Sequence, residues 1–269
     1  MTEHCQVWGV SMVKDEADVI DATVSHLVTQ KVDGLLIADN GSSDGTREIL
    51  EALQSRFSAI LPIVVVEDRE PAYYQSQKMT ALAEQAYAEH GATWIVPFDA
   101  DELWYGDTSP LGYLLAEYAD NVDCILARLY NHFPTSGDAS DPNPFTRIAQ
   151  RDPTPAPLPK VALRWQPGMV IHQGNHGADG VHTSLRERVS IRHFPWRSFE
   201  QFERKVRNGA AAYRLTTLPE EMGGHWRGYG QILESGGPEA LRRDVWEQWF
   251  FDPPLKLESS PAPFMRAYP

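Results

Sequence analysis

Residues 94–102 have the sequence Trp94-Ile-Val-Pro-Phe-Asp99-Ala-Asp101-Glu102, an apolar run that ends in three acidic residues. The run has the length and composition of a buried strand. Ligands of open α/β sheets bind outside the carboxyl ends of the strands, so the acids stand where a site is expected. Strand alternation directs Asp99 and Asp101 to the same side, where both carboxylates can approach one cation. Oxygen ligands suit hard ions, so the pattern favours Mg²⁺ or Mn²⁺ over the alternative of acids that only solubilise a strand end.

Strand and helix patterns alternate over the first 130 residues on both sides of this run. Apolar strand-like segments occupy residues 5–13, 34–39, 60–66, 93–98 and 121–130. Helical spacing of apolar residues occupies 15–29, 44–57 and the region of 79–86. This alternation predicts an α/β fold with a mostly parallel central sheet flanked by helices.

Two further polar segments follow predicted strands. Residues 38–46 have the sequence Ala-Asp-Asn-Gly-Ser-Ser-Asp-Gly-Thr, and residues 11–16 have the sequence Ser-Met-Val-Lys-Asp-Glu. Taken alone, the first is a well-made turn that caps a helix. Parallel strands bring their carboxyl ends to one edge of the sheet, however, so all three polar segments meet there. Their convergence predicts one binding site.

The second half of the chain does not continue the alternation of strand and helix patterns. Residues 134–159 contain seven prolines and form a long irregular segment, which either borders a site or is a plain exposed loop. Strand-like pieces follow near 161–165 and 189–193, and a helix opens at Ser198 with Gln201 completing a capping box. The tail after Asp252 is rich in proline and predicts a surface strap or a partly disordered end.

Composition narrows the class of protein. The net charge of −13 argues against nucleic acid as the main partner, because phosphate backbones select basic surfaces. Eight Lys or Arg nevertheless stand against three Glu between Arg186 and Arg214, which indicates either a solvated helix face or a local anion site. Cys5 and Cys124 are expected to be free thiols. Without an apolar run long enough to span a membrane and without a secretory signal pattern, we expect a cytoplasmic enzyme, with peripheral membrane attachment left open.

These motifs together resemble those of family 2 glycosyltransferases, which share the nucleotide-sugar-binding fold called GT-A. The family's first strand ends in Asn-Glu or Asp-Glu, matched by Asp15-Glu16, and its second motif, Asp-Asp-Gly-Ser-Thr-Asp-Gly-Thr, is similar to residues 39–46, with Asn40 and Ser43 as the departures. The Asp-x-Asp metal motif corresponds to residues 99–101. The match covers roughly residues 7–105.

The Asp-Ala-Asp-Glu form is similar to a branch of the family that continues with His-Tyr/Phe-x-x-Arg/Lys-Ser. Here that segment is His193-Phe-Pro-Trp-Arg197-Ser198, followed by Lys205 and Gly209. The resemblance extends to roughly residues 190–210, whereas residues 130–185 and the tail have no counterpart that we can place in the family. We divide the chain into three parts: a nucleotide-sugar-binding α/β half (1–130), an acceptor-side half of the same domain, irregular and helical (131–251), and a Pro-rich tail (252–269).

The resemblance also implies a site. Asp99 and Asp101 would bind Mn²⁺ or Mg²⁺, with His193 as a third ligand or a pyrophosphate contact; the His193 side chain could equally be structural. The residues assigned to the nucleotide-sugar donor, a UDP-sugar by family habit, are Val13, Asp15, Glu16, Asp39, Asn40, Lys78, Asp99, Arg197 and Lys205.

Family 2 enzymes generally invert the configuration of the transferred sugar, which requires a base on the face opposite the leaving group. Our candidate is Asp179, which lies in a histidine-rich segment, with Glu102 as the second choice. The acceptor would be a hydroxyl compound, whether glycan, lipid-linked glycan, protein or small molecule.

Two other classes of protein compete with this interpretation. Residues 41–45, Gly-Ser-Ser-Asp-Gly, match the nucleophile elbow of α/β-hydrolases, with Ser43 as the nucleophile and His193 as a partner, but that interpretation leaves Asp99 and Asp101 unexplained. A non-catalytic module that binds a nucleotide or sugar would keep the donor motifs and need no base.

Overall fold

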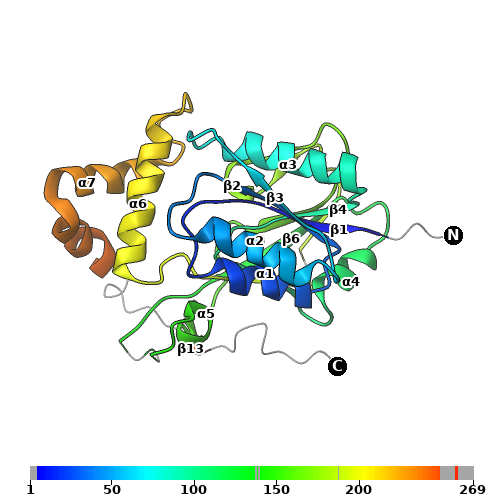
Figure 1. Cartoon of the computed structure of the whole chain (residues 1–269), viewed down its shortest axis with the longest axis horizontal. Helices are drawn as coiled ribbons and strands as arrows, with labels where there is room; N and C mark the ends of the chain where they lie inside the picture. The colour runs from blue at the N-terminus through cyan, green and yellow to red at the C-terminus, as the bar shows by residue number, and fades with distance from the viewer. Residues whose placement is uncertain (1–4, 137, 139, 187, 249–257, 260–269) are drawn as a thin grey trace.

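The computed structural model describes residues 5–136, 138, 140–186, 188–248 and 258–259, and the expected α/β fold is confirmed there (Figure 1). Its central element is a nine-stranded sheet. The strands of this sheet are β1 (Val7–Val13), β2 (Gly34–Asp39), β3 (Ile63–Glu67), β4 (Trp94–Pro97), β5 (Glu102–Gly106), β6 (Cys124–Asn131), β8 (Lys160–Arg164), β11 (Ser184–Leu185) and β12 (Val189–His193).

The helices and the small strands surround this sheet. The helices are α1 (Ile20–Thr29), α2 (Thr46–Phe57), α3 (Gln75–His90), α4 (Leu111–Ala116), α5 (Pro144–Arg147), α6 (Phe199–Arg214) and α7 (Gly224–Leu241). Two short helical turns are the 3₁₀ turn η1 (Gln173–Asn175) and the π-helical turn η2 (Arg242–Trp246). Two small ribbons pair β9 (Val170–Ile171) with β10 (Ala178–Asp179) and β7 (Gln150–Arg151) with β13 (Glu258–Ser259).

The strand order is β3-β2-β1-β4-β8-β6-β12-β5, with β11 beside β6. The first four strands are parallel, as the alternating pattern predicts. Strand β8 then inserts antiparallel between β4 and β6, and β12 pairs parallel with β6 and antiparallel with β5. Strands from both halves of the sequence therefore share one mostly parallel sheet.

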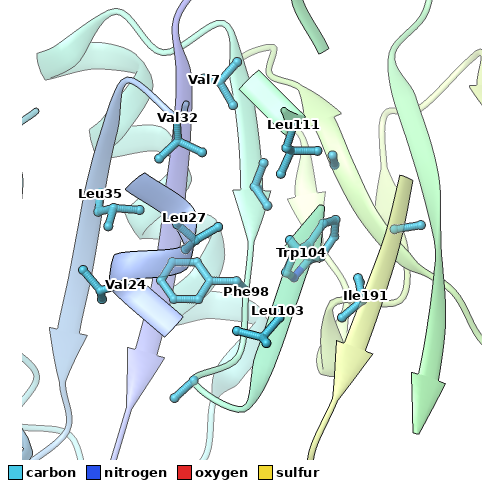
Figure 2. Close-up of a cluster of buried hydrophobic side chains, with 14 of the residues drawn as sticks. Val7, Val24, Leu27, Val32, Leu35, Phe98, Leu103, Trp104, Leu111 and Ile191 are labelled. Carbon is cyan, nitrogen blue, oxygen red and sulfur yellow. The ribbon is translucent and has the colours of Figure 1, made fainter. Parts of the chain in front are cut away.

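Two apolar layers hold the sheet between its helices. Figure 2 shows part of the layer under α1, in which Leu27, Phe98, Leu103 and Trp104 pack together and are fully buried. The other face is covered by α3 through Met79, Leu82, Ala83 and Ala86. Burial of such side chains is the main source of stability of a fold of this kind.

Two expected boundaries are wrong. Helix α1 begins at Ile20 rather than near residue 15, because Asp15 has a left-handed backbone (φ 54°) and the residues after it bind other segments. Strand β4 ends at Pro97, so Asp99 and Asp101 lie in a turn between β4 and β5, closed by a bond from the Glu102 amide to the Asp99 carbonyl. Strand alternation therefore does not set the direction of their side chains.

The second half contains one long helix that the sequence pattern did not indicate. Helix α7 includes several glycines and Pro238, which normally signal loops, and its backbone bends at Gly237 (φ 70°). It packs on α6, where the Cα of Gly230 lies so close to Ala210 that an added Cβ would stand 2.5 Å from the alanine Cβ. Residues 134–159 are mostly irregular, as expected, and the tail after Asp252 lies outside the described residues except for β13.

No described helix is long and apolar enough to cross a membrane. Cys5 and Cys124 are both free, as expected, and Cys124 is buried in β6.

Candidate active site

A cavity of about 310 Å³ lies between the carboxyl edge of the sheet and the α6–α7 pair. The sheet contributes the end of β1 with the loop after it (residues 12–16), the turn after β4 (residues 99–101) and His193 at the end of β12. Helix α6 and the first turn of α7 form the other wall. The three polar segments that the sequence predicts to meet do lie at one edge of the sheet. Several residues of segments 11–16 and 99–102 line this cavity, and segment 38–46 contributes Asn40.

Asp101 is the most enclosed acid of the cavity, with 2% of its surface exposed. Its Oδ2 accepts a hydrogen bond from the Lys205 ammonium, and Arg197 Nη1 lies 3.6 Å from the same oxygen. Burial raises the pKa of a carboxyl group, but the charges of Lys205 and Arg197 outweigh it and hold the pKa of Asp101 well below its usual range. Asp101 is therefore ionised at neutral pH.

The other oxygen of Asp101 faces a histidine. Nε2 of His193 lies 3.6 Å from Asp101 Oδ1, and Nδ1 of the same ring bonds to Asn131 Oδ1 at 2.7 Å. An amide oxygen only accepts, so Nδ1 is the donor and Nε2 carries a lone pair. Burial lowers the pKa of His193 to about 4, which keeps the ring neutral. Two acceptors consequently face each other across a gap the size of a cation.

Asp99 lies in the same turn but binds a different set of partners. Lys160 Nζ lies 2.6 Å from its Oδ2, and the side-chain amides of Gln75 and Asn175 donate to its Oδ1 at 3.4 and 3.2 Å. Lys160 is 4% exposed and comes from β8. The two acids of the Asp-x-Asp motif are thus neutralised by two different lysines.

Glu102, the second-choice base, is completely buried beneath this turn. Its carboxylate accepts from the Trp104 indole at 3.0 Å and lies 3.0 Å from Lys160. Burial raises its pKa to about 7, against the opposing charge of Lys160. A side chain with no exposed surface cannot reach an acceptor hydroxyl, so Glu102 supports the turn and is not placed to act as the base.

The first-choice base, Asp179, lies on β10 and does not line the cavity. Its side chain is 73% exposed and its Oδ1 is 2.9 Å from His172 Nε2. The histidine-rich segment packs against α3 and contributes Asn175 to Asp99 instead. The position of Asp179 therefore gives the prediction of a base no support.

Arg197 joins the β12–α6 connection to the loop after β1. Only 1% of its side chain is exposed, and the guanidinium binds Asp18 at 2.7 and 2.9 Å, Glu16 at 2.5 Å and the Phe194 carbonyl at 3.1 Å. This fork is the geometry in which arginine binds carboxylates best. The charge of Arg197 is thus already neutralised by Glu16 and Asp18. Among the Lys and Arg residues between 186 and 214, Arg204 and Lys205 line the cavity.

The donor-side residues of the first half fall into two groups. Val13, Asp15, Glu16 and Asn40 line the cavity. Asp39 is 5% exposed and accepts from the Ser42 amide at 3.2 Å, so it shapes the turn beside the cavity.

Lys78 reaches the same neighbourhood indirectly. Its ammonium is paired with Asp68 at 2.6 Å, and Asp68 in turn accepts from the Asn40 amide at 2.8 Å.

Ser43 lacks the setting of a nucleophile. Its hydroxyl and backbone amide both donate to Asp15 Oδ1, at 3.3 and 2.7 Å. A nucleophile elbow strains the backbone of its serine, whereas Ser43 is not among the described residues with a left-handed conformation. The hydrolase interpretation is therefore unsupported.

Several residues of the site were not predicted. Asn131 and Lys160 hold His193 and Asp99. Asn131 ends β6, and Lys160 begins β8, which runs antiparallel to β4 and β6, so both stand at the edge of the sheet where site residues are expected. The α6–α7 wall carries Tyr213, Trp226 and His225, for which the sequence offers no pattern except a cluster of aromatic residues.

The sequence comparisons identify the family of this chain. The model of the family described as Glycosyl transferase family 2 matches residues 10–176, which is more than half of the chain. The chain belongs to glycosyltransferase family 2. It is accordingly an enzyme that transfers a sugar, and its α/β sheet with a helical C-terminal region has the GT-A-like architecture of such enzymes. No functionally curated protein matches the sequence.

Solved structures with a similar fold share little sequence with this chain. S. aureus TarS 1-349 is 13% identical, with 90% of this chain and 77% of that chain covered and a TM-score of 0.45. The same protein in complex with UDP-GlcNAc is 12% identical with the same coverage and a TM-score of 0.44. GalNAc-T7 with UDP, GalNAc and Mn²⁺ is 10% identical, with 95% of this chain and 59% of that chain covered and a TM-score of 0.45.

Proposed function

We propose that this glycosyltransferase uses a divalent cation, Mn²⁺ or Mg²⁺, to transfer a sugar from a UDP-sugar to a hydroxyl acceptor, with inversion at the sugar. The observation that carries the proposal is the pair of facing acceptors, His193 Nε2 and Asp101 Oδ1, 3.6 Å apart. Two lone pairs repel each other unless a cation lies between them. The choice of UDP rests on the resemblance to the family.

Asp101 and His193 suit a metal ion that takes only a few of its ligands from the protein. The described residues contain no group of three or more His, Cys, Asp or Glu arranged around one ion. Mg²⁺ and similar ions commonly bind one or two protein groups and complete their shell with water and substrate phosphates. Asp101 and His193 would hold the ion, with Asn131 orienting the imidazole. When bound, it supplies Lewis-acid stabilisation of charge on the departing diphosphate.

The chain's own cations assist at the same place. Lys205 and Arg204 project from α6 into the cavity, close to Asp101 and Asp15. A diphosphate would attract the Lys205 ammonium away from Asp101 Oδ2, because the phosphate oxygens offer more charge at less desolvation cost. Lys205, rather than the enclosed Arg197, is thus the cation that we assign to the donor diphosphate.

The nucleoside is assigned to the loops after β1 and β2. Asn40 and Val13 line the cavity, and Asp39 sits just behind them. The Asn40–Asp68–Lys78 cluster fixes this side through a hydrogen bond from Asn40 to Asp68 at 2.8 Å and an ion pair between Lys78 and Asp68 at 2.6 Å. In this assignment residues 1–130 form the donor half, and the acceptor enters from the α6–α7 wall contributed by residues 131–251.

Metal-dependent nucleotide binding is the test. Isothermal calorimetry with UDP, GDP and dTDP, with and without Mn²⁺, should give binding for UDP that is lost in EDTA. His193→Ala should greatly weaken Mn²⁺-dependent UDP binding but change the melting temperature of the protein only slightly. Full UDP affinity and full transfer in excess EDTA would contradict the metal assignment, and preference for another nucleotide would change the donor.

A further inference from the structure

The α7 side of the cavity carries an imidazole with unusual surroundings. His225 lies in the first turn of α7, where its side chain lines the cavity and is exposed to solvent. Its ring contacts Trp226 and Tyr229, with centroids 4.7 and 6.1 Å away. Within the described part of the chain, no hydrogen bond or ion pair engages its ring nitrogens.

The acids that line the cavity are all engaged. Asp15 accepts from Ser43 and Asn208, Glu16 binds Arg197 and Lys205, Asp99 binds Lys160, and Asp101 binds Lys205. A carboxylate that is paired with a cation is a weak base, because the cation stabilises its ionised form.

The remaining cavity groups are also poor proton acceptors. His193 has its Nδ1 on Asn131 and its Nε2 directed at Asp101. Burial raises the pKa of Tyr73 and of Tyr213, so both phenols stay protonated. His225 differs from all of these, because no hydrogen bond or ion pair of the described residues engages its ring nitrogens. Partial burial lowers the pKa of its imidazole, so the ring is neutral and has a lone pair available.

His225 and the proposed metal ligands come from different elements that line the cavity. Asp101 and His193 enter the cavity from the edge of the sheet, whereas α7 packs mainly against α6 and η2. Trp226 holds the first turn of α7 in place, since its indole lies over Gly209 so closely that an added Cβ would stand 3.0 Å from it. Trp196 meets the same indole edge-on, with ring centroids 6.1 Å apart.

We propose, on the basis of the proposed function, that His225 is the general base that deprotonates the acceptor hydroxyl. The acceptor oxygen attacks the anomeric carbon of the donor sugar and forms the new glycosidic bond. The bond from that carbon to the diphosphate oxygen breaks, and its electron pair leaves with the nucleoside diphosphate. The hydroxyl proton passes to an imidazole nitrogen of His225, which later releases it to water.

The acceptor class follows from the same wall. Trp226, Tyr213 and Tyr73 line the same cavity as His225, and aromatic faces pack well against apolar surfaces that carry polar groups at their rims. A sugar ring has such a face of C–H groups with hydroxyls around it. The acceptor is accordingly a carbohydrate hydroxyl, presented to His225 while its ring rests on the aromatic side chains.

The experiment uses nucleophiles that do and do not carry a proton. His225→Asn is compared with the unmodified enzyme and with His182→Asn, an exposed histidine that does not line the cavity. Each is given UDP-glucose or UDP-N-acetylglucosamine with Mn²⁺, and donor cleavage is measured with water or with added azide as the nucleophile. UDP affinity is measured in parallel by calorimetry.

His225→Asn should lower hydrolysis at least 10²-fold, which is the usual loss for a missing general base, and leave UDP affinity unchanged. Azide is an anion and needs no base, so it should restore cleavage in the variant and yield a glycosyl azide of inverted configuration. Hydrolysis at the unmodified rate, or a loss that azide does not restore, would overturn the assignment of His225. Absence of UDP binding and donor cleavage in the unmodified enzyme would instead overturn the proposed function.

Discussion

The Nε2 atom of His193 lies 3.6 Å from Oδ1 of Asp101, and neither atom has a proton to offer the other. The proton of the imidazole is on Nδ1, where the side chain of Asn131 accepts it at 2.7 Å. The orientation of a metal-ligating histidine is usually fixed in this way, through the nitrogen that does not touch the metal.

Asn131→Ala should therefore weaken Mn²⁺ binding by about 10- to 100-fold, the range typical of lost outer-shell partners, because the imidazole then loses its fixed tautomer. Calorimetric titration of Mn²⁺ in the presence of UDP measures the change. Asn121→Ala, at an exposed position, is the control and should titrate like the unmodified protein. Equal Mn²⁺ affinity in both variants would show that His193 needs no support from Asn131.

Arg197→Met should lower the free energy of unfolding by about 3–5 kcal/mol, because it leaves Glu16 and Asp18 without their buried partner. Arg207→Met removes an exposed ion pair with Glu203 and should change stability by no more than about 0.5 kcal/mol. Urea unfolding of both variants gives the comparison. Similar small losses for the two arginines would mean that the guanidinium fork contributes little to stability.

Gly230→Ala and Gly228→Ala should have opposite effects on stability. An added Cβ at Gly230 would stand 2.5 Å from the Ala210 Cβ, so α7 must move away from α6, at a cost of about 1–3 kcal/mol. At Gly228 no atom lies within 4 Å of the new Cβ, and alanine should stabilise the helix by about 1 kcal/mol. Melting temperatures that shift in the same direction for both would argue against close α6–α7 packing at this point.

Acid should destabilise the protein through His26, which is buried under the sheet and donates from Nε2 to the Trp104 carbonyl at 2.6 Å. Burial lowers its pKa from 6.5 to about 4. Between these values the unfolded chain binds a proton that the folded chain does not, so stability is present above pH 6.5 and is lost as the pH falls toward 4.

The stability difference between the unmodified protein and His26→Gln should accordingly narrow by about 1 kcal/mol per pH unit from pH 6 to pH 5. His182→Gln, at an exposed histidine, serves as the control and should show no such narrowing. Urea midpoints at the two pH values measure both. A constant difference for His26→Gln would show that this histidine does not resist protonation in the folded state.

The sequence allowed accurate prediction wherever local pattern and tertiary structure agree. Strand β2 was predicted at its observed bounds, because residues 34–38 carry no polar side chain and the strand lies within a parallel region of the sheet. The N-cap of α6 at Ser198 was also correct, since its side chain accepts from the Gln201 amide at 3.1 Å. The Gln201 side chain, however, binds the Arg197 amide instead of that of Ser198, so the capping box is shifted by one residue.

The failures lie where distant contacts override local pattern. Helix α1 starts late because Glu16 and Asp18 bind Arg197, a residue more than a hundred positions away. The glycines of α7 signal a loop in isolation, yet at Gly230 the missing side chain permits close packing. The two candidate bases were chosen by residue type alone, which reveals neither the burial of Glu102 nor the distance of Asp179 from the cavity.

Strand β12 lies between β6 and β5 in the sheet, which limits where the sequence can be divided when segments are exchanged between enzymes of this architecture. A crossover point placed within residues 131–193 would separate strands that hydrogen-bond to one another, so chimeras cut there should not assemble. A cut after His193 leaves the whole sheet, with Asp101, Asn131 and His193, on one side. Helices α6 and α7 lie wholly beyond such a cut, so exchange of this segment would replace Lys205 and His225, the proposed diphosphate contact and the proposed base, and would leave intact the sheet that carries Asp101, Asn131 and His193.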